Sequence, residues 1–247
     1  MCHCYAAQVT EADVGAALDR LYIDAPGATL RKEDLKKARE MAAFLVEVAR
    51  ARPRRAGEVV VVDAAAGKGY VGVLSAASLA PAHVHFIERD PTRLAAAEIA
   101  TRRAGVPSVR FSFHSGDVGD PTLWPDEPDL VMALHACGPA ADAILAAAMR
   151  TRARRLLVGP CCTPSRDAAV AERMGVPRHA SVRRAFLESL VLAERTLRLE
   201  AAGWETEVVP FVAPTVTPHN LAFRARRVGE RGRMRAMAAR LARLLAA

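Results

Sequence analysis

Short apolar runs alternate with helical patterns along most of the chain. The runs are rich in β-branched residues and have few polar interruptions, as expected of strands that are buried on both faces of a sheet. In chain order they cover residues 58–63, 84–88, 109–114, 129–134, 155–159, 205–212 and 220–228. This alternation predicts an α/β fold with a seven-stranded, mostly parallel sheet and helices on both faces.

Helical patterns flank this region. Thr10 and Asp13 have the spacing of a capping box, and apolar residues recur at helical spacing over residues 32–51, shortly before Pro53. We therefore divide the chain into an amino-terminal helical cap, a central domain and a carboxy-terminal helix, with the bounds 1–55, 56–228 and 229–247.

The carboxy-terminal helix is amphipathic. Most of its arginines lie outside an apolar stripe formed by Met234, Met237, Ala238, Leu241, Leu244 and Leu245. Such a stripe favours a helix that packs on the sheet or on a partner subunit. A role at nucleic acid or at a membrane surface is the alternative.

Composition narrows the class of protein. Of the 247 residues, 51% are hydrophobic and 25% are charged, which excludes a chain that is disordered throughout. No apolar run reaches the ~18 residues of a membrane span, and the amino terminus lacks a signal pattern, so we expect a soluble, cytoplasmic protein. The odd number of cysteines, five, does not suggest a disulfide framework.

The net charge is +8, from 35 basic and 27 acidic residues. This surplus favours an anionic partner such as nucleic acid. However, only four of the basic residues are lysines (Lys32, Lys36, Lys37 and Lys68), and coding bias also produces such an arginine excess. The charge alone therefore leaves both RNA and a small molecule open as partners.

A glycine-containing loop follows the first strand of the central domain, with the sequence Asp63-Ala-Ala-Ala-Gly67-Lys68-Gly69-Tyr70-Val71-Gly72. Counted from Gly67, the loop has the Gly-x-Gly-x-x-Gly spacing of a dinucleotide site. Counted from Asp63, an acid closes the strand four positions before the first glycine. A carboxylate at that place repels a diphosphate and attracts a cationic ligand.

Two further acids follow the next two strands. Glu88 stands nineteen residues after Gly69, where a carboxylate can accept hydrogen bonds from ribose hydroxyls, and Asp117 can accept one from an adenine amino group. Three acids after three consecutive strands favour a cationic nucleoside. Each also has a structural alternative: Asp63 as a cap of the following turn, Glu88 as a helix-start acid, and Asp117 as a turn residue.

The segment from Val59 to Gly72 resembles the first motif of class I S-adenosylmethionine-dependent methyltransferases. Asp129–Gly138 with Asp142, together with Val158–Cys162, resembles a narrower branch that includes the acceptor-stem tRNA 2′-O-methyltransferases; Lys36–Glu40 and Pro218–Ala222 are similar to it as well. The resemblance implies a Rossmann-like fold and S-adenosylmethionine as cofactor. It also implies these cofactor-binding residues: Asp63, Ala65, Gly67, Lys68, Gly69, Glu88, Arg89, Asp117, Val118, Leu134 and His135.

The chain departs from this branch in three places. Ala65 stands where the family has a glycine, which we expect to be tolerated only if the backbone there does not need a positive φ. Thr163-Pro164 follow the cysteine pair in place of histidines, and the amino-terminal zinc modules of the tRNA enzymes are missing. The resemblance therefore implies a methyltransferase, with tRNA as one candidate acceptor.

Methyl transfer is an in-line displacement that needs an oriented nucleophile and, for a weakly acidic one, a base. His135 and Cys137 follow the fourth strand and are the candidate catalytic residues; we expect His135 to act as a base or to orient the acceptor. The alternative for His135 is a backbone-bonded residue that lines the cofactor pocket. For Cys137, Cys161 and Cys162 the favoured interpretation is packing.

A metal site is a further candidate, because Cys2-His3-Cys4, His135 and Cys137 offer thiolates and imidazoles. Their spacings do not match those of ordinary zinc sites, so we expect no metal. The prediction is an S-adenosylmethionine-dependent methyltransferase with an unidentified acceptor. The alternatives are an NAD(P)-dependent oxidoreductase that uses the Gly67–Gly72 loop and a non-catalytic nucleic-acid-binding protein.

Overall fold

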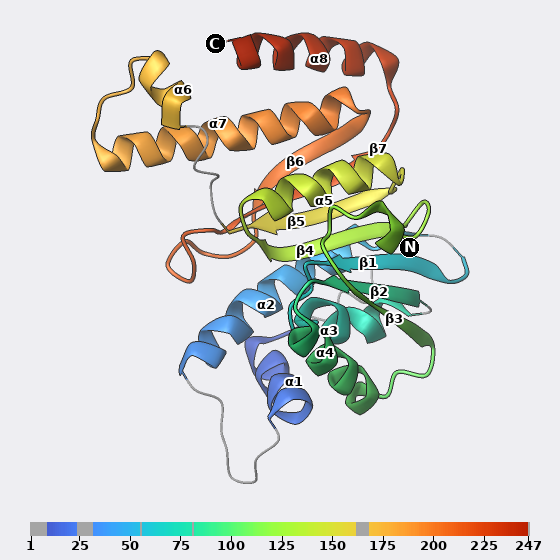
Figure 1. The fold of residues 1–247 in the computed structure, drawn as a ribbon. Helices are drawn as coiled ribbons and strands as arrows, with labels where there is room; N and C mark the ends of the chain where they lie inside the picture. Colours follow the sequence, from blue (N-terminus) through green and yellow to red (C-terminus); the bar gives the residue numbers. More distant parts are fainter. Residues whose placement is uncertain (1–8, 24–31, 55, 81, 162–167, 247) are drawn as a thin grey trace, which may run out of the picture.

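The computed structural model of the chain describes residues 9–23, 32–54, 56–80, 82–161 and 168–246 (Figure 1). Within these residues, seven strands form one sheet in the order β3-β2-β1-β4-β5-β7-β6. Their bounds are β1 Val59–Ala64, β2 Ala82–Glu88, β3 Val109–Ser115, β4 Leu130–Ala136, β5 Arg155–Pro160, β6 Trp204–Pro210 and β7 Leu221–Arg227. Only β7 is antiparallel to its neighbours, so the predicted mostly parallel sheet is confirmed.

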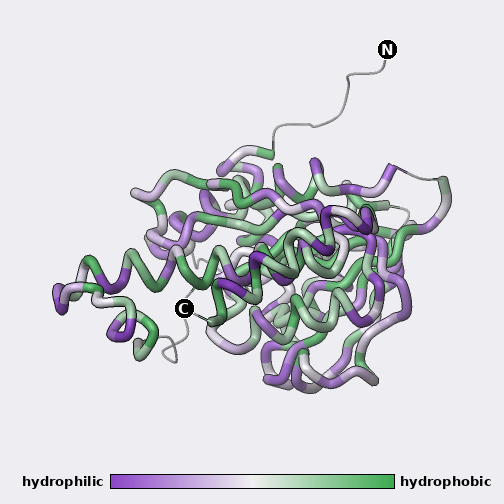
Figure 2. Tube along the Cα trace, turned by 90° about the horizontal axis from the view of Figure 1, so that it is seen from above, coloured by the Kyte–Doolittle hydropathy of each residue, from purple (hydrophilic) through white to green (hydrophobic). Residues whose placement is uncertain are grey.

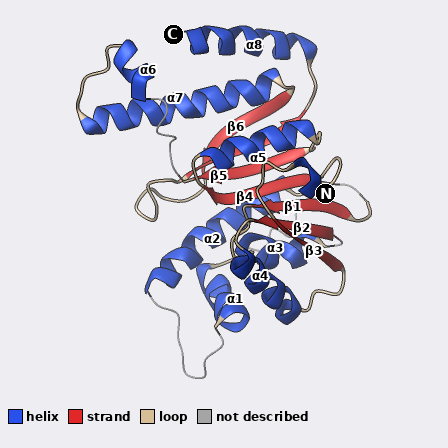
Figure 3. Ribbon diagram, viewed as in Figure 1, coloured by secondary structure: helices blue, strands red, loops and turns tan. Residues whose placement is uncertain are grey.

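Helices cover both faces of the sheet (Figure 3). One face carries α1 (Glu11–Tyr22), α2 (Lys32–Ala51), α3 (Tyr70–Leu79) and α4 (Pro91–Ala104), and the other carries α5 (Pro139–Arg150) and α7 (Ala180–Ala201). Successive residues of β1 therefore enter different cores: Val61 packs with residues of α1–α4, and Val62 packs with residues of α5 and α7. Both valines are fully buried, which explains the uninterrupted apolar run of this strand.

Local side-chain signals mark two helix starts. The Thr10 hydroxyl accepts a hydrogen bond from the Asp13 N–H (3.1 Å), and the Asp13 carboxylate accepts one from the Thr10 N–H (3.0 Å), so the predicted capping box of α1 is confirmed. Asp90 caps α4 by accepting hydrogen bonds from the N–H groups of Thr92 and Arg93. These bonds satisfy amides that the first turn of a helix cannot pair internally.

The last helix, α8 (Arg231–Ala246), lies along α7 and not flat on the sheet, which was one of its two expected packing sites (Figure 1). The reason is that α7 already packs on β6, so α8 lies mainly against α7, and its Arg233 forms ion pairs with Glu200 of α7 (2.8 Å) and Glu205 of β6 (3.9 Å). The other expected packing site, a partner subunit, stays a prediction. None of its residues is buried, and Leu245 of the apolar stripe is 54% exposed. Among the described residues, no helix is both long enough and apolar enough to cross a membrane.

A short helix that the sequence pattern did not predict, α6 (Ala168–Arg173), lies beside the start of α7. Together with the amino-terminal half of α7 it projects from the rest of the molecule (Figures 1 and 2). The buried residues of α7, which are Val191, Arg195 and Leu199, all belong to its carboxy-terminal half. The packed half alone therefore anchors this helix to the sheet.

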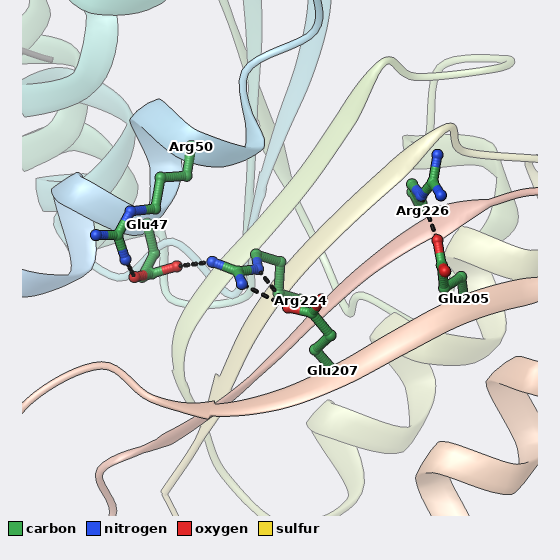
Figure 4. A network of polar contacts seen from close by, with 6 residues as sticks. All are labelled: Glu47, Arg50, Glu205, Glu207, Arg224 and Arg226. Carbon is green, nitrogen blue, oxygen red and sulfur yellow. Dashed lines mark hydrogen bonds and ion pairs between the residues drawn. The ribbon is translucent and has the colours of Figure 1, made fainter.

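A polar network joins α2 to the far end of the sheet (Figure 4). Glu47 of α2 is buried and binds Arg50 of its own helix and Arg224 of β7, at 2.7 Å for the second pair. Arg224 also binds Glu207 of β6 at 2.5 Å. The network fixes α2 across the sheet, so that the amino-terminal half of this helix reaches the edge where the parallel strands end.

Candidate active site

A cavity of about 880 Å³ opens at the carboxyl edge of the sheet. It is lined by the ends of β1, β2 and β4, by the loop after β1, and by the amino-terminal half of α2. Every cofactor-binding residue predicted from the sequence except Gly69 lines this cavity, and Cys137 does so too. These side chains meet because parallel strands all end at the same edge of the sheet.

The loop after β1 contains three residues in the left-handed conformation: Ala65 (φ 53°), Gly67 (φ 58°) and Gly69 (φ 74°). The expectation that Ala65 avoids a positive φ is therefore wrong, and the conformation costs an alanine about 1–2 kcal/mol. Two backbone hydrogen bonds hold the loop in this shape, from Ala66 N–H to the Ile87 carbonyl (3.1 Å) and from Gly69 N–H to the Ala66 carbonyl (2.8 Å). The pairing with β2 thus enforces a turn that the alanine alone disfavours.

Gly69 and Gly72 are required by close packing. A Cβ atom on Gly69 would lie 2.6 Å from the Ala97 Cβ, and one on Gly72 would lie 2.4 Å from the Phe86 ring. Gly69 therefore allows α3 to approach β2 and α4, and it does not line the cavity as predicted.

Asp63 at the end of β1 is 1% exposed, and its carboxylate accepts a hydrogen bond from the Gly72 N–H at 2.8 Å. Burial raises the pKa of this carboxyl to about 8; the Gly72 N–H opposes the rise, and the negative charge of Glu88 adds to it. The side chain also lines the cavity. Asp63 thus caps the loop and also lines the cavity. Both interpretations of the sequence, a turn cap and a residue of the ligand site, therefore apply to it.

Glu88 and Asp117 also line the cavity. Glu88 is buried and accepts hydrogen bonds from Gly67 N–H (2.7 Å) and Asp90 N–H (3.0 Å), whereas Asp117 is exposed and accepts one from Gly119 N–H (2.7 Å). The hydrogen bond from Gly119 to Asp117 is the one expected if Asp117 is a turn residue, its structural alternative. A carboxylate has about four acceptor positions, so both acids keep capacity for a ligand.

His135 sits at an irregularity of β4, where the pairing with β5 shifts between Leu134 and Ala136. Its φ is 63°, a left-handed conformation, and its side chain is 40% exposed toward the cavity edge. The imidazole Nε2 lies 2.9 Å from a carboxylate oxygen of Glu40 on α2. The structural alternative supposed that His135 binds a backbone group. Its partner is instead a carboxylate.

Cys137 and Cys161 form a disulfide, with their Cα atoms 5.3 Å apart. The packing interpretation was wrong for this pair, since Cys137 is exposed. Because β4 and β5 are neighbours in the sheet, the residues that follow them come within bridging distance. Cys162 and the Cys2-His3-Cys4 segment lie outside the described residues. Within the part of the chain that the structure describes, no group of three His, Cys, Asp or Glu side chains is arranged to hold a metal.

Several site residues were missed by sequence reasoning. Glu33, Lys37 and Met41 follow one another at four-residue spacing on the face of α2 that lines the cavity, a periodicity that could have indicated a shared surface. The Lys37 ammonium lies 4.3 Å from the centre of the Tyr70 ring, which also lines the cavity. The cap helix α2 therefore supplies one wall of the site.

The other cap helix contacts the loop directly. The Tyr22 hydroxyl, at the end of α1, donates a hydrogen bond to the Lys68 carbonyl at 3.1 Å, and the Tyr22 and Tyr70 ring centres are 4.5 Å apart. Burial raises the pKa of the Tyr22 hydroxyl, so this hydroxyl stays a hydrogen-bond donor even at alkaline pH. The amino-terminal cap is thus part of the site and not only a neighbour of it.

Comparison with known proteins identifies the family of the chain. Residues 33–166, more than half of the chain, match the family described as methyltransferase domain. No curated protein matches the chain. Nor do the comparisons support the oxidoreductase or the non-catalytic alternative.

Solved structures share the fold at low identity. Magnesium protoporphyrin IX methyltransferase (ChlM) from Synechocystis PCC 6803 is 14% identical with a TM-score of 0.52, over 86% of this chain and 94% of that chain. CalS10, an amino pentose methyltransferase from Micromonospora echinaspora, is 16% identical with a TM-score of 0.50, over 83% and 100%. The ribosomal protein L11 methylase from Lactobacillus delbrueckii subsp. bulgaricus is 11% identical with a TM-score of 0.50, over 77% and 80%. The fold is Rossmann-like, as predicted, and the chain belongs to the methyltransferase domain family.

Proposed function

We propose that this methyltransferase takes its methyl group from S-adenosylmethionine bound in the cavity at the carboxyl edge of the sheet. The observation that carries the proposal is that three carboxyl side chains, Asp63, Glu88 and Asp117, come from three adjacent strands and line one cavity. Glu88 would accept hydrogen bonds from the ribose hydroxyls and Asp117 from the adenine amino group. The ChlM structure is described with bound SAH and the CalS10 structure with bound SAM, which supports the same ligand class here.

The loop amides argue against a dinucleotide. A diphosphate would need free N–H groups at the glycine loop and at the start of α3. Here the Gly67 N–H donates to Glu88 and the Gly72 N–H donates to Asp63. Both amides therefore already face carboxylates, an arrangement that suits the positive sulfonium and ammonium groups of the proposed donor.

Calorimetric titration tests the donor. We expect S-adenosylhomocysteine to bind in the micromolar range and NAD not to bind. Glu88→Gln should weaken the binding by about 1–3 kcal/mol, because it removes a charge-assisted acceptor. The control is Glu98→Gln on α4, whose carboxylate pairs with Arg102 on the surface. Binding of NAD in place of S-adenosylhomocysteine would refute the proposal.

For the acceptor, the distribution of charge favours RNA over a small molecule. Residues 168–247 contain fourteen arginines and seven glutamates and so carry +7 of the net charge of +8. On α8, Arg231, Arg235, Arg240 and Arg243 are exposed and form no ion pair with any described residue. Unpaired arginines on one exposed helix suit the phosphates of a polyanion. The resemblance to acceptor-stem tRNA 2′-O-methyltransferases points to the same substrate class.

Filter binding with total cell tRNA tests the acceptor. We expect the affinity to fall steeply with salt, and Arg235→Ala with Arg240→Ala to reduce the salt slope by about 0.7–0.9 for each phosphate that the variant no longer binds. Arg102→Ala with Arg110→Ala is the matched control, because both arginines are exposed but already pair with glutamates. Equal binding by the two double variants would exclude α8 as the RNA surface and favour a small-molecule acceptor.

A further inference from the structure

We propose that Glu40 is a positioning residue for methyl transfer, which fixes the His135 imidazole in one tautomer and stabilises it when it takes a proton from the acceptor. The inference deepens the proposed function and rests on it. It assigns a role to a residue of the cap helix α2, outside the loops that hold the donor.

The contact joins two distant parts of the chain. Glu40 and His135 are 95 residues apart, yet Glu40 Oε2 lies 2.9 Å from His135 Nε2. An ionised carboxylate only accepts hydrogen bonds, so Nε2 carries the proton and Nδ1 of the neutral imidazole keeps its lone pair. Nδ1 has no hydrogen-bond partner among the described residues, and His135 lines the cavity. The pair thus leaves one imidazole nitrogen without a described partner on a residue that lines the cavity.

Burying the Glu40 carboxylate costs folding free energy, which a contact that only joins a helix to the sheet would not require. Its side chain is 10% exposed, and Oε1 is buried with no hydrogen-bond partner among the described residues. A buried carboxylate with one unsatisfied oxygen costs free energy that a bond to a partly exposed histidine recovers only in part. An imidazolium in contact with the carboxylate would recover more, because the two charges attract.

The backbone conformation of His135 also indicates a functional role. The residue holds a φ of 63° at the shifted pairing of β4, and sparsely populated backbone conformations of this kind gather at active sites. Glu40 holds the side chain, and the flanking residues Leu134 and Ala136 are both paired with β5. The strained backbone of His135 and the unsatisfied buried oxygen of Glu40 therefore occur in two residues that are in contact.

The step that follows conserves atoms and charge. The acceptor O–H loses its proton to His135 Nδ1 while the oxygen lone pair forms the new bond to the methyl carbon. The carbon–sulfur bond breaks, and its electron pair stays on sulfur, which turns the sulfonium into a neutral thioether. The imidazolium then lies against Glu40 until its proton passes to water. General-base assistance of this kind contributes about 10²–10⁴-fold to a rate.

Glu47 provides a matched control for Glu40. Both glutamates are buried on α2, both bind a basic or imidazole side chain of the sheet, and they lie two helical turns apart. Neither glutamate lines the cavity itself, but His135, the partner of Glu40, does, whereas Arg224 and Arg50, the partners of Glu47, do not. A loss of activity caused by loosening of α2 would appear in both variants, whereas a loss caused by the imidazole would appear only at position 40.

The experiment measures single-turnover transfer of label from S-adenosylmethionine to total cell tRNA, with melting temperature and S-adenosylhomocysteine affinity measured in parallel. Glu40→Gln keeps an oxygen that accepts the Nε2 hydrogen bond but loses the charge. We expect its transfer rate to fall about 10- to 100-fold, and that of Glu40→Ala to fall further, with donor affinity within twofold of the wild type. Glu47→Gln should transfer label within twofold of the wild-type rate.

Two outcomes overturn the inference alone. One is a folded Glu40→Gln chain that transfers label at the wild-type rate, which would make the contact a structural tie. The other is an equal loss of rate in Glu40→Gln and Glu47→Gln. A wild-type chain that binds no S-adenosylhomocysteine and labels neither tRNA nor the small-molecule fraction of an extract overturns the proposed function itself, and this inference with it.

Discussion

Asp63 is a single carboxyl on which burial, a backbone hydrogen bond and a neighbouring charge act in different directions. Burial and Glu88 both disfavour its charged form, while the Gly72 N–H favours it. Burial is the largest of the three, so the pKa rises from 3.8 to about 8. A cationic ligand in the cavity would reverse this balance, because a positive charge stabilises the ionised carboxylate.

This raised pKa predicts a pH-dependent stability. The folded chain binds a proton that the unfolded chain has released, so the contribution of Asp63 is complete below pH 3.8 and is lost as the pH rises through about 8. Relative to Asp63→Asn, which keeps an oxygen for the Gly72 N–H, the wild type should lose up to about 1.4 kcal/mol of unfolding free energy per pH unit in this window. Urea unfolding at pH 5 to 8.5 measures the difference. Parallel curves for the two chains would contradict the raised pKa.

At the scale of elements, α5 and α7 are joined by an ion pair whose arginine is buried. Arg195 of α7 is 2% exposed and binds both carboxylate oxygens of Asp142 on α5, at 2.8 and 3.2 Å. A bidentate guanidinium–carboxylate contact fixes the direction of both helices as well as their distance. It also explains structurally why an acid follows the Leu134–Gly138 segment in the sequence.

Asp142→Ala should lower the unfolding free energy by about 3–5 kcal/mol, because it leaves the Arg195 charge buried without its carboxylate. The control is Glu194→Ala, which breaks a pair with Arg198 four residues along the same helix, where the arginine is 47% exposed and stays in contact with water, and which should cost less than about 1 kcal/mol. Urea denaturation of both variants checks the prediction. Similar losses in the two variants would show that the buried pair has no special role.

At the scale of the whole molecule, the Glu47 network connects parts that the chain order separates. The amino-terminal helix α2 is joined through Glu47 and Arg224 to β7, almost at the other end of the chain (Figure 4). Residues 33–166, which match the methyltransferase family, include α2 but end before β6 and β7. The network therefore ties the family domain to the carboxy-terminal strands.

Glu47→Ala should lower the unfolding free energy by about 1–3 kcal/mol, because it removes a buried partner from two arginines while Arg224 keeps Glu207. Glu205→Ala is the comparison within Figure 4, since the pair of Glu205 with Arg226 is exposed and should contribute less than about 1 kcal/mol. Thermal melts of both variants provide the measurement. A larger loss at Glu205 than at Glu47 would contradict the role given to burial.

Local chemistry was enough to predict the seven strands and half of the residues that line the cavity. The Thr10 capping box, the β-branched run of β1 and the acids after β1, β2 and β3 are short-range signals, and the direction of parallel strands then places those acids at one edge. Ala65 was misjudged because its φ is imposed by a hydrogen bond of the next residue to β2, which no local pattern contains.

The remaining features needed the tertiary structure, because they depend on which distant residues come together. Periodicity shows that α2 and α8 are helices but not what each one meets, so the Glu40–His135 contact, the Cys137–Cys161 disulfide and the packing of α8 on α7 were invisible in the sequence. Secondary-structure propensity and strand direction depend on residues that are neighbours in the sequence. Histidine tautomers, the burial of charges and disulfide pairing depend on which distant residues come close in space. The amino-acid sequence by itself thus determined the sheet and the acids at its edge, and the folded arrangement decided which side chain stands behind His135.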